Sequence, residues 1–180
     1  MNFPVNEKKA TQATARIIEA SGGPTDYLRL MKLIYLSDRE SILRRGIPIV
    51  GGHYYSMRNG PTIGEVMNFV NRRNAEQWAE TISPRFGNEV RLQDRPSFES
   101  LSKSEMEILD LTVAQHAHRA TDELVDWCHE NCNEYENVDL SRRKPIEVES
   151  ILRAGGKSAK AIQKVLENAR EVEEMDALLR

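Results

Sequence analysis

The sequence predicts a compact, mainly α-helical domain with a small β-hairpin or sheet, an α+β fold that ends in a C-terminal amphipathic helix. Apolar residues recur at helical spacing through most of the 180 residues. Glycine and proline clusters at 22–24, 46–52 and 59–61 divide these segments. Short extended runs flank one of the clusters. The chain is 39% hydrophobic and 29% charged, a composition typical of a globular domain.

Two helices are expected at the N-terminal end. Apolar side chains at helical spacing predict the first over residues 5–20, and Gly22-Gly23-Pro24 ends it. Thr25 is a suitable cap for the second helix, and Asp26 lies near its positive end. This helix continues to a natural stop at Gly46. Because it is apolar around most of its circumference, we expect it at the centre of the fold.

The segment after Gly46 has the pattern of a β-hairpin. Ile47–Val50 and His53–Met57 are short extended runs separated by Gly51-Gly52. Pro48 limits the first run to a sheet edge, because proline cannot donate a ladder hydrogen bond. Asn59-Gly60-Pro61 then predicts a turn.

Further elements follow in order along the chain. Ser102 and Glu105 form the pattern of a capping box, which predicts a helix start there. Pro145 is suited to the first turn of a short helix. The expected elements are a helix over 62–81, a short strand over 89–93, helices over 102–117, 121–133 and 145–152, and a last helix from Ser158.

The last helix carries an apolar stripe on one face, formed by Ile162, Val165, Leu166, Ala169, Val172 and Leu179. We therefore expect a domain over residues 5–153 and an amphipathic C-terminal helix over 157–180. The helix either packs on this domain or binds a partner.

Charge and cysteine content limit the partners and the compartment. The net charge is -3, with an excess of basic residues before residue 100 and of acidic residues after it. Such mild asymmetry indicates no direct nucleic-acid partner. No apolar run approaches the length of a membrane span, and the polar N-terminus lacks the apolar core of a secretory signal. We expect a cytoplasmic protein with no membrane partner, whose Cys128 and Cys132 stay reduced.

Several residue groups invite a chemical interpretation. His116, His118, Cys128, His129 and Cys132 fall within one short span, but a structural zinc needs four converging ligands, and histidines two apart on a helix diverge. Gly156-Lys157-Ser158 resembles the end of a phosphate-binding loop, but the earlier glycine is missing, so Ser158 is better interpreted as a helix cap.

Nucleophile patterns are equally incomplete. Ser37, Asp38 and His53 are near one another in sequence, as are Asp126, Cys128 and His129, without the surrounding context of a nucleophile elbow. Asp38 is expected to pair with a basic residue or face solvent. We predict no catalytic residue, no cofactor and no metal.

One stretch resembles a known family. Lys32-Leu33-Ile34-Tyr35-Leu36-Ser37-Asp38-Arg39 is followed by Gly46-Ile47-Pro48-Ile49, Gly51, Tyr54, Met57 and Gly60-Pro61, in the order and spacing of the Panacea, or SocA-like antitoxin, domain. Glu123–Asp126 leading to His129, and Ile146–Leu152, extend the resemblance over about residues 10–153. Thr62 and Glu134-Tyr135 depart from the pattern. The motif residues are Lys32, Tyr35, Asp38, Arg39, Gly46, Pro48, Gly51, Tyr54, Gly60, Pro61 and His129.

The resemblance implies a function that needs no catalytic residue. It implies the antitoxin of a type II-like toxin–antitoxin module, which neutralises a partner toxin, encoded by a neighbouring gene, through direct binding. Some relatives deliver the toxin to a protease, so a proteolytic adaptor is the first alternative. A metal-dependent or hydrolytic enzyme is the second.

The motif itself is either structural or partner-facing. Lys32 lies in an apolar helix, where a buried ammonium needs a carboxylate or carbonyl partner. Tyr35, about one turn away, is expected to place its ring in the core and its hydroxyl at a polar rim. Gly46, Pro48, Gly60 and Pro61 are expected to shape turns.

Overall fold

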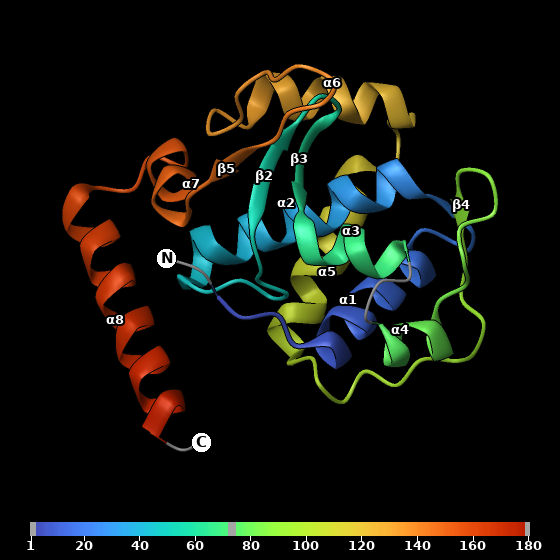
Figure 1. Ribbon diagram of the computed structural model, residues 1–180, viewed down its shortest axis with the longest axis horizontal. Coiled ribbons are helices and arrows are strands. Elements are labelled where there is room, and N and C mark those ends of the chain that lie inside the picture. Colours follow the sequence, from blue (N-terminus) through green and yellow to red (C-terminus); the bar gives the residue numbers. More distant parts are fainter. Residues whose placement is uncertain (1–2, 72–74, 179–180) are drawn as a thin grey trace.

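The computed structural model of the chain describes residues 3–71 and 75–178, with side chains to residue 171. Helix α2 (Tyr27–Arg45) lies at its centre, as predicted. It packs against α1 (Glu7–Ala20), α5 (Lys103–His116), α6 (Thr121–Asn131) and α7 (Val148–Ala154). Figure 1 shows α2 behind the β-hairpin, with α1 and α5 on one side and α6 on the other. Gly46 ends α2 with a positive φ of 78°.

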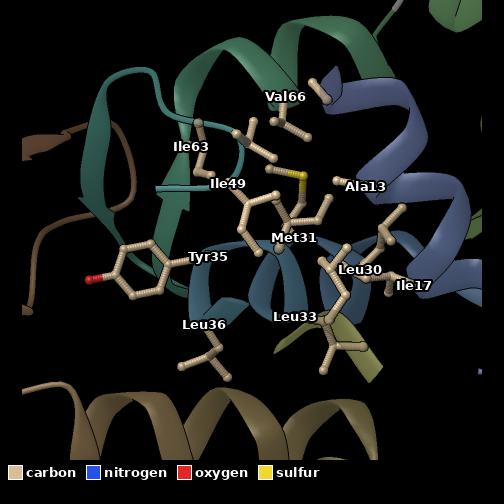
Figure 2. Close-up of a cluster of buried hydrophobic side chains, with 14 of the residues drawn as sticks. Ala13, Ile17, Leu30, Met31, Leu33, Tyr35, Leu36, Ile49, Ile63 and Val66 are labelled. Atoms are coloured by element: carbon tan, nitrogen blue, oxygen red, sulfur yellow. The ribbon is translucent and has the colours of Figure 1, made fainter. Parts of the chain in front are cut away.

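The core is built around the apolar side chains of α2. Leu30 and Leu33 are fully buried and Ile34 nearly so. Figure 2 shows α2 residues meeting Ala13 and Ile17 from α1, together with Ile63 and Val66 from the hairpin and the helix after it. This apolar cluster covers α2 on several sides, which explains why its sequence is apolar around most of its circumference.

The cap of α2 differs from the prediction. The Asp26 carboxylate accepts hydrogen bonds from the backbone N–H groups of Leu28 and Arg29, so Asp26 is the cap. Thr25 instead belongs to the short strand β1 (Thr25–Asp26), which pairs with β4 (Glu89–Val90). An aspartate serves both as cap and as a favourable charge at the helix N-terminus.

The β-hairpin also lies later in the chain than predicted. Strands β2 (Tyr54–Met57) and β3 (Gly60–Ile63) pair antiparallel, whereas the predicted strand Ile47–Val50 is a loop. Strand β5 (Lys144–Ile146) joins the other side of β2, giving the order β3-β2-β5. Pro61 and Pro145 therefore lie in strands rather than in a turn and a helix start. Both strands are sheet edges, where proline is tolerated.

The other elements follow the predicted order with shifted bounds. The predicted helix over 62–81 is two helices in the described residues, α3 (Gly64–Val70) and α4 (Glu76–Thr81). The Ser102–Glu105 capping box at the start of α5 is confirmed. The short helix α7 begins at Val148, after strand β5 rather than at Pro145. The last helix, α8, covers Ala159–Leu178.

Among the described side chains of helix α8, an apolar stripe is shielded from solvent. Ile162 and Ala169 are buried, and Val165 and Leu166 are partly buried. Val165 lies beside Gly46, where an added Cβ would come within 3.1 Å of its Cγ2 atom. Figure 1 shows α8 leaving the domain next to α7. The predicted stripe residues Val172 and Leu179 lie outside the described side chains.

Within the part of the chain that the structure describes, no helix has both the length and the apolar content needed to cross a membrane.

Candidate functional site

The polar motif residues of α2 lie on one buried face of that helix. Lys32, Tyr35 and Asp38 are three residues apart, so each lies close to one turn from the next. Their exposed fractions are 2%, 0% and 0%. Burying polar groups to this degree is costly unless each finds a partner. Their partners therefore define what this face does.

Lys32 binds the hairpin through a carbonyl group. Its Nζ donates a hydrogen bond to the backbone oxygen of Pro61 at 2.6 Å. This confirms that the buried ammonium has one of the two expected kinds of partner. Burial lowers the pKa of Lys32 to about 8. Lys32 thus holds the first half of β3 against α2.

Tyr35 and Arg39 share one buried carboxylate, that of Glu134. The Tyr35 hydroxyl donates to Glu134 Oε1 at 2.7 Å, and Arg39 donates to both carboxylate oxygens, at 2.7 and 3.3 Å. The Tyr35 hydroxyl points away from the apolar cluster, as Figure 2 shows, but ends at this buried carboxylate rather than at an exposed rim. The Glu134 side chain is itself 0% exposed. Charge-assisted bonds of this kind are strong and directional.

Sequence reasoning missed the role of Glu134. From the sequence alone, Glu134-Tyr135 is only a departure from the family pattern. A signal was available, because a tyrosine and an arginine one turn apart on an apolar helix each need a hydrogen-bond acceptor, and their closeness allows one acceptor to serve both. Nothing in the local sequence identifies which distant carboxylate supplies it.

Asp38 organises the loop before the hairpin. Its carboxylate accepts backbone N–H bonds from Ile49, Val50 and Gly51 at 2.8–2.9 Å, and the Tyr54 hydroxyl donates to it at 2.9 Å. Burial raises the pKa of Asp38 to about 6, although these four hydrogen bonds act in the opposite direction. The expectation that Asp38 pairs with a base or faces solvent is wrong, because Asp38 is 0% exposed and its described hydrogen-bond donors are the three loop N–H groups and the Tyr54 hydroxyl.

Two glycines allow close approach around this face. Gly51 has a φ of 78°, and a Cβ placed there would lie 2.9 Å from the backbone oxygen of Phe3. Gly60 has a φ of 92° and lies against both the Lys32 side chain and His129 Nε2. The buried Pro48 lies in the same loop as Gly51.

His129 and Tyr135 connect α6 to the hairpin. Their rings stack with centroids 4.6 Å apart and an interplanar angle of 2°. The Tyr135 hydroxyl donates to the backbone oxygen of Met57 at 3.1 Å. Burial lowers the pKa of His129, with Lys32 adding to the effect. The structure therefore brings the polar motif residues together and uses them to fasten the sheet and α6 to α2.

The alternative chemical groupings do not assemble. No group of three or more His, Cys, Asp or Glu residues among those described is placed to hold a metal ion. Cys128 and Cys132 are buried free thiols. His116 packs edge-on against Trp127, with centroids 4.6 Å apart, and Ser37 donates to the backbone oxygen of Leu33. Ser158 accepts from the Ala161 N–H, in keeping with its interpretation as a helix cap.

The described contacts of His53 are with Glu65 and Tyr55. Its backbone N–H donates to Glu65 Oε2 and its Nδ1 lies 2.5 Å from Glu65 Oε1, while its ring stacks on Tyr55. Ser37, Asp38 and His53 therefore each have different partners. The described contacts do not link these three residues into the hydrogen-bonded chain that nucleophilic catalysis uses.

An open pocket lies beside the buried face, between the start of α2, the hairpin tip and α3. It has a volume of about 190 Å³. Its apolar walls include methionines, and Lys32 forms part of its lining. We name it the Lys32 pocket; its lining residues are Tyr27, Leu28, Met31, Lys32, Met57, Arg58, Asn59, Gly60, Thr62, Met67 and Leu140. Sequence reasoning did not find it, because its walls come from four separate segments.

The fold and this face define a small α+β domain in which a central helix uses buried polar side chains to hold a three-stranded sheet. The chain belongs to the family described as the antitoxin SocA-like, Panacea domain, whose model matches residues 30–135. The match includes the α2 face, the hairpin and Glu134. It ends before β5, α7 and α8. No curated protein and no solved structure matches the chain.

Proposed function

We propose that this chain is the antitoxin of a type II-like toxin–antitoxin module and holds its partner toxin inactive by direct binding. The observation that carries the proposal is membership of the SocA-like antitoxin family, which supports an antitoxin role in general. The partner is a cognate toxin encoded by a neighbouring gene. Neutralisation by contact requires a shaped surface and no reactive group.

The use of the motif side chains supports this proposal. Lys32, Tyr35, Asp38 and Arg39 make their hydrogen bonds inside the domain. They stabilise a sheet and a hairpin whose tip borders the Lys32 pocket. On this proposal the motif maintains the fold, and the toxin contacts the surface that the fold presents.

Co-expression with the product of the neighbouring gene tests the proposal. The neighbouring gene product alone should arrest growth, and expression of this chain should restore growth. The two proteins should also co-purify. A neighbour that is harmless when expressed alone would contradict the antitoxin role. A second readout, the half-life of the neighbour in cells, separates neutralisation by binding from delivery to a protease. Direct binding leaves that half-life unchanged or longer, and an adaptor shortens it.

The division of the chain is part of the same proposal. The domain over residues 5–153 carries the toxin-binding surface, and the helix over 157–180 supports it by packing at the end of α2 and on α7. The contact between Val165 and Gly46 supports this arrangement.

Elemental analysis of the purified protein tests the metal-dependent alternative, since stoichiometric zinc would contradict the proposal.

A further inference from the structure

We propose that the Lys32 pocket receives an acidic side chain of the partner toxin, presented on a segment whose neighbouring side chains are apolar. This rests on the proposed function, because it assigns the surface through which the toxin is bound. It specifies the chemistry of the toxin segment, a carboxylate with aliphatic or aromatic neighbours.

The charge of the pocket favours an anion. Lys32 and Arg58 both line it, and its lining residues include no aspartate or glutamate. Arg58 is exposed, so its guanidinium is available at the mouth. A surface that presents cations alone attracts a partner of opposite charge and disfavours one of like charge.

Lys32, which lines the pocket, has hydrogen-bonding capacity beyond its described bond. An ammonium carries three N–H donors, and Lys32 makes one described hydrogen bond, to the Pro61 oxygen. Its side chain is 2% exposed, so bulk water supplies little compensation. From α6 and its C-terminal cap, the groups beside it are His129 and the thiols of Cys128 and Cys132, none of them a carboxylate. A toxin carboxylate entering the pocket would provide both a hydrogen-bond acceptor and a counter-charge.

The walls suit apolar neighbours of that carboxylate. Met31, Met57 and Met67 are half of the six methionines of the protein. Methionine side chains adapt to irregular shapes and are favoured on surfaces that accept varied partners. Leu140 at the pocket is 77% exposed, an unusual position for a large apolar side chain. Covering it with a toxin side chain would remove this apolar surface from water.

The size of the pocket sets the scale of the occupant. A volume of about 190 Å³ accommodates one side chain and part of its neighbours, and does not accommodate a helix or a folded loop. The walls are also held in place, since Lys32 fastens β3 and the Tyr135 hydroxyl fastens the end of β2 at Met57. A preformed pocket lowers the entropic cost of binding. It therefore suits an anchor residue at the centre of a larger interface.

Toxin affinity measured by calorimetry on full-length variants tests the assignment. The substitutions Leu140→Asp and Arg58→Glu each place a carboxylate at the pocket and should weaken binding by about tenfold or more. Both residues are exposed, so the fold should tolerate either change. Ile47→Asp is the matched control. Ile47 is an exposed aliphatic residue, 44% accessible, beyond the opposite end of the 19-residue helix α2, and its substitution should change the affinity by less than about twofold.

A second pair of measurements addresses Lys32 directly. Lys32→Met keeps an unbranched side chain that is one atom shorter and removes its charge, and its melting curve reports whether the fold survives. In the toxin, each acidic residue is replaced by its amide. One such toxin variant should bind the wild-type chain about tenfold or more weakly than the unchanged toxin does. The same toxin variant and the unchanged toxin should bind the Lys32→Met chain with equal affinity.

The outcomes separate the two proposals. If wild-type chain binds and neutralises the toxin while Leu140→Asp and Arg58→Glu bind equally well, the pocket assignment is wrong and the antitoxin function stands. If the wild-type chain neither binds the neighbouring product nor rescues growth, the proposed function itself fails.

Discussion

At the scale of single residues, the chain depends on a few buried polar side chains that reach partners far along the sequence. Glu134 is 99 residues from Tyr35 and 95 from Arg39, and Pro61 is 29 from Lys32. Leaving a buried polar group without its hydrogen-bond partner costs the full free energy of removing that group from water. Each bond therefore favours one arrangement of the sheet and α6 on α2 and penalises the alternatives.

Replacing Glu134 by glutamine should destabilise the protein by about 3 kcal/mol, because it leaves the partly buried Arg39 without its counter-charge. Tyr35→Phe should cost less, about 1–2 kcal/mol, since it removes one hydrogen bond and keeps the ring. Urea unfolding curves measure both. Glu136→Gln is the matched control, two residues away. Glu136 is exposed and paired with the exposed Lys144, so its change should stay within about 0.5 kcal/mol. Equal effects at Glu134 and Glu136 would contradict the structural role of Glu134.

His116 should make stability depend on acidity. Burial, with Arg119 and Arg29 nearby, lowers its pKa from 6.5 to about 4. The unfolded chain therefore binds this proton more tightly than the folded one, and the stabilisation is full above about pH 6.5 and is lost as the pH falls toward 4. Between these values the wild type should lose stability faster than His116→Gln, by at most about 1.4 kcal/mol per pH unit. Unfolding curves at several pH values test this, and parallel slopes would contradict it.

At the scale of secondary-structure elements, local signals were reliable where the chain interacts with itself over short distances. The capping box at Ser102 and the glycine stop at Gly46 were both predicted from neighbouring residues. The loop over residues 47–50 was predicted as a strand because its pattern is extended. Asp38 binds the N–H groups of Ile49 and Val50, so they are unavailable to a sheet.

The structure of Lys144–Ile146 is likewise decided by a contact with a distant segment and not by its local sequence pattern. Pro145 at the start of an apolar run suits a helix start equally well, and the pairing with Tyr54–Ser56 decides between the two. The Lys32 pocket and the acceptor role of Glu134 were also missed, because both arise from segments far apart in sequence. Helix positions were therefore largely predictable, and the sheet and the candidate site were not.

Gly51→Ala should destabilise the loop that precedes the hairpin by about 2 kcal/mol or more. Its φ of 78° disfavours a side chain, and the added Cβ would lie 2.9 Å from the Phe3 oxygen. Gly87→Ala is the control. Gly87 also has a positive φ, 60°, but its Cβ would meet open space, so the cost should be near 1 kcal/mol. Thermal unfolding of both variants measures the difference, and an equal loss would show that the contact with Phe3 is unimportant.

At the scale of the whole molecule, α8 is an addition to a core that lies mainly before it. The buried apolar cluster runs from Ala10 to Leu152, and among the described side chains of α8 Ile162 joins it, with the partly buried Val165 and Leu166 packed against it. Helix α8 also lies beyond residues 30–135, which match the family model. The arrangement predicts a domain whose fold does not require its last helix.

Removing residues 157–180 should leave a folded protein with a lower melting temperature. The truncation exposes the surface beneath Ile162 and Val165 and leaves the α2 network intact. Circular dichroism should show one cooperative transition. Ile162→Asp in the full chain should lower the melting temperature in the same direction, because it places a charge at a position 7% exposed. A truncated chain with no cooperative transition would show that α8 is required for folding.

The Tyr35–Glu134–Arg39 arrangement has a consequence for a nascent chain. Synthesis proceeds from the N-terminus at about 5–20 residues per second, so roughly 5–20 s separate the appearance of Arg39 from that of Glu134. Throughout that interval α2 holds a cation and a hydroxyl whose acceptor has not been made. Asp38 and Lys32 meet their partners far earlier, at residues 49–61. We therefore expect the hairpin to associate with α2 while the ribosome is still translating, and α6 to be fixed to α2 only after residue 134 has left the exit tunnel.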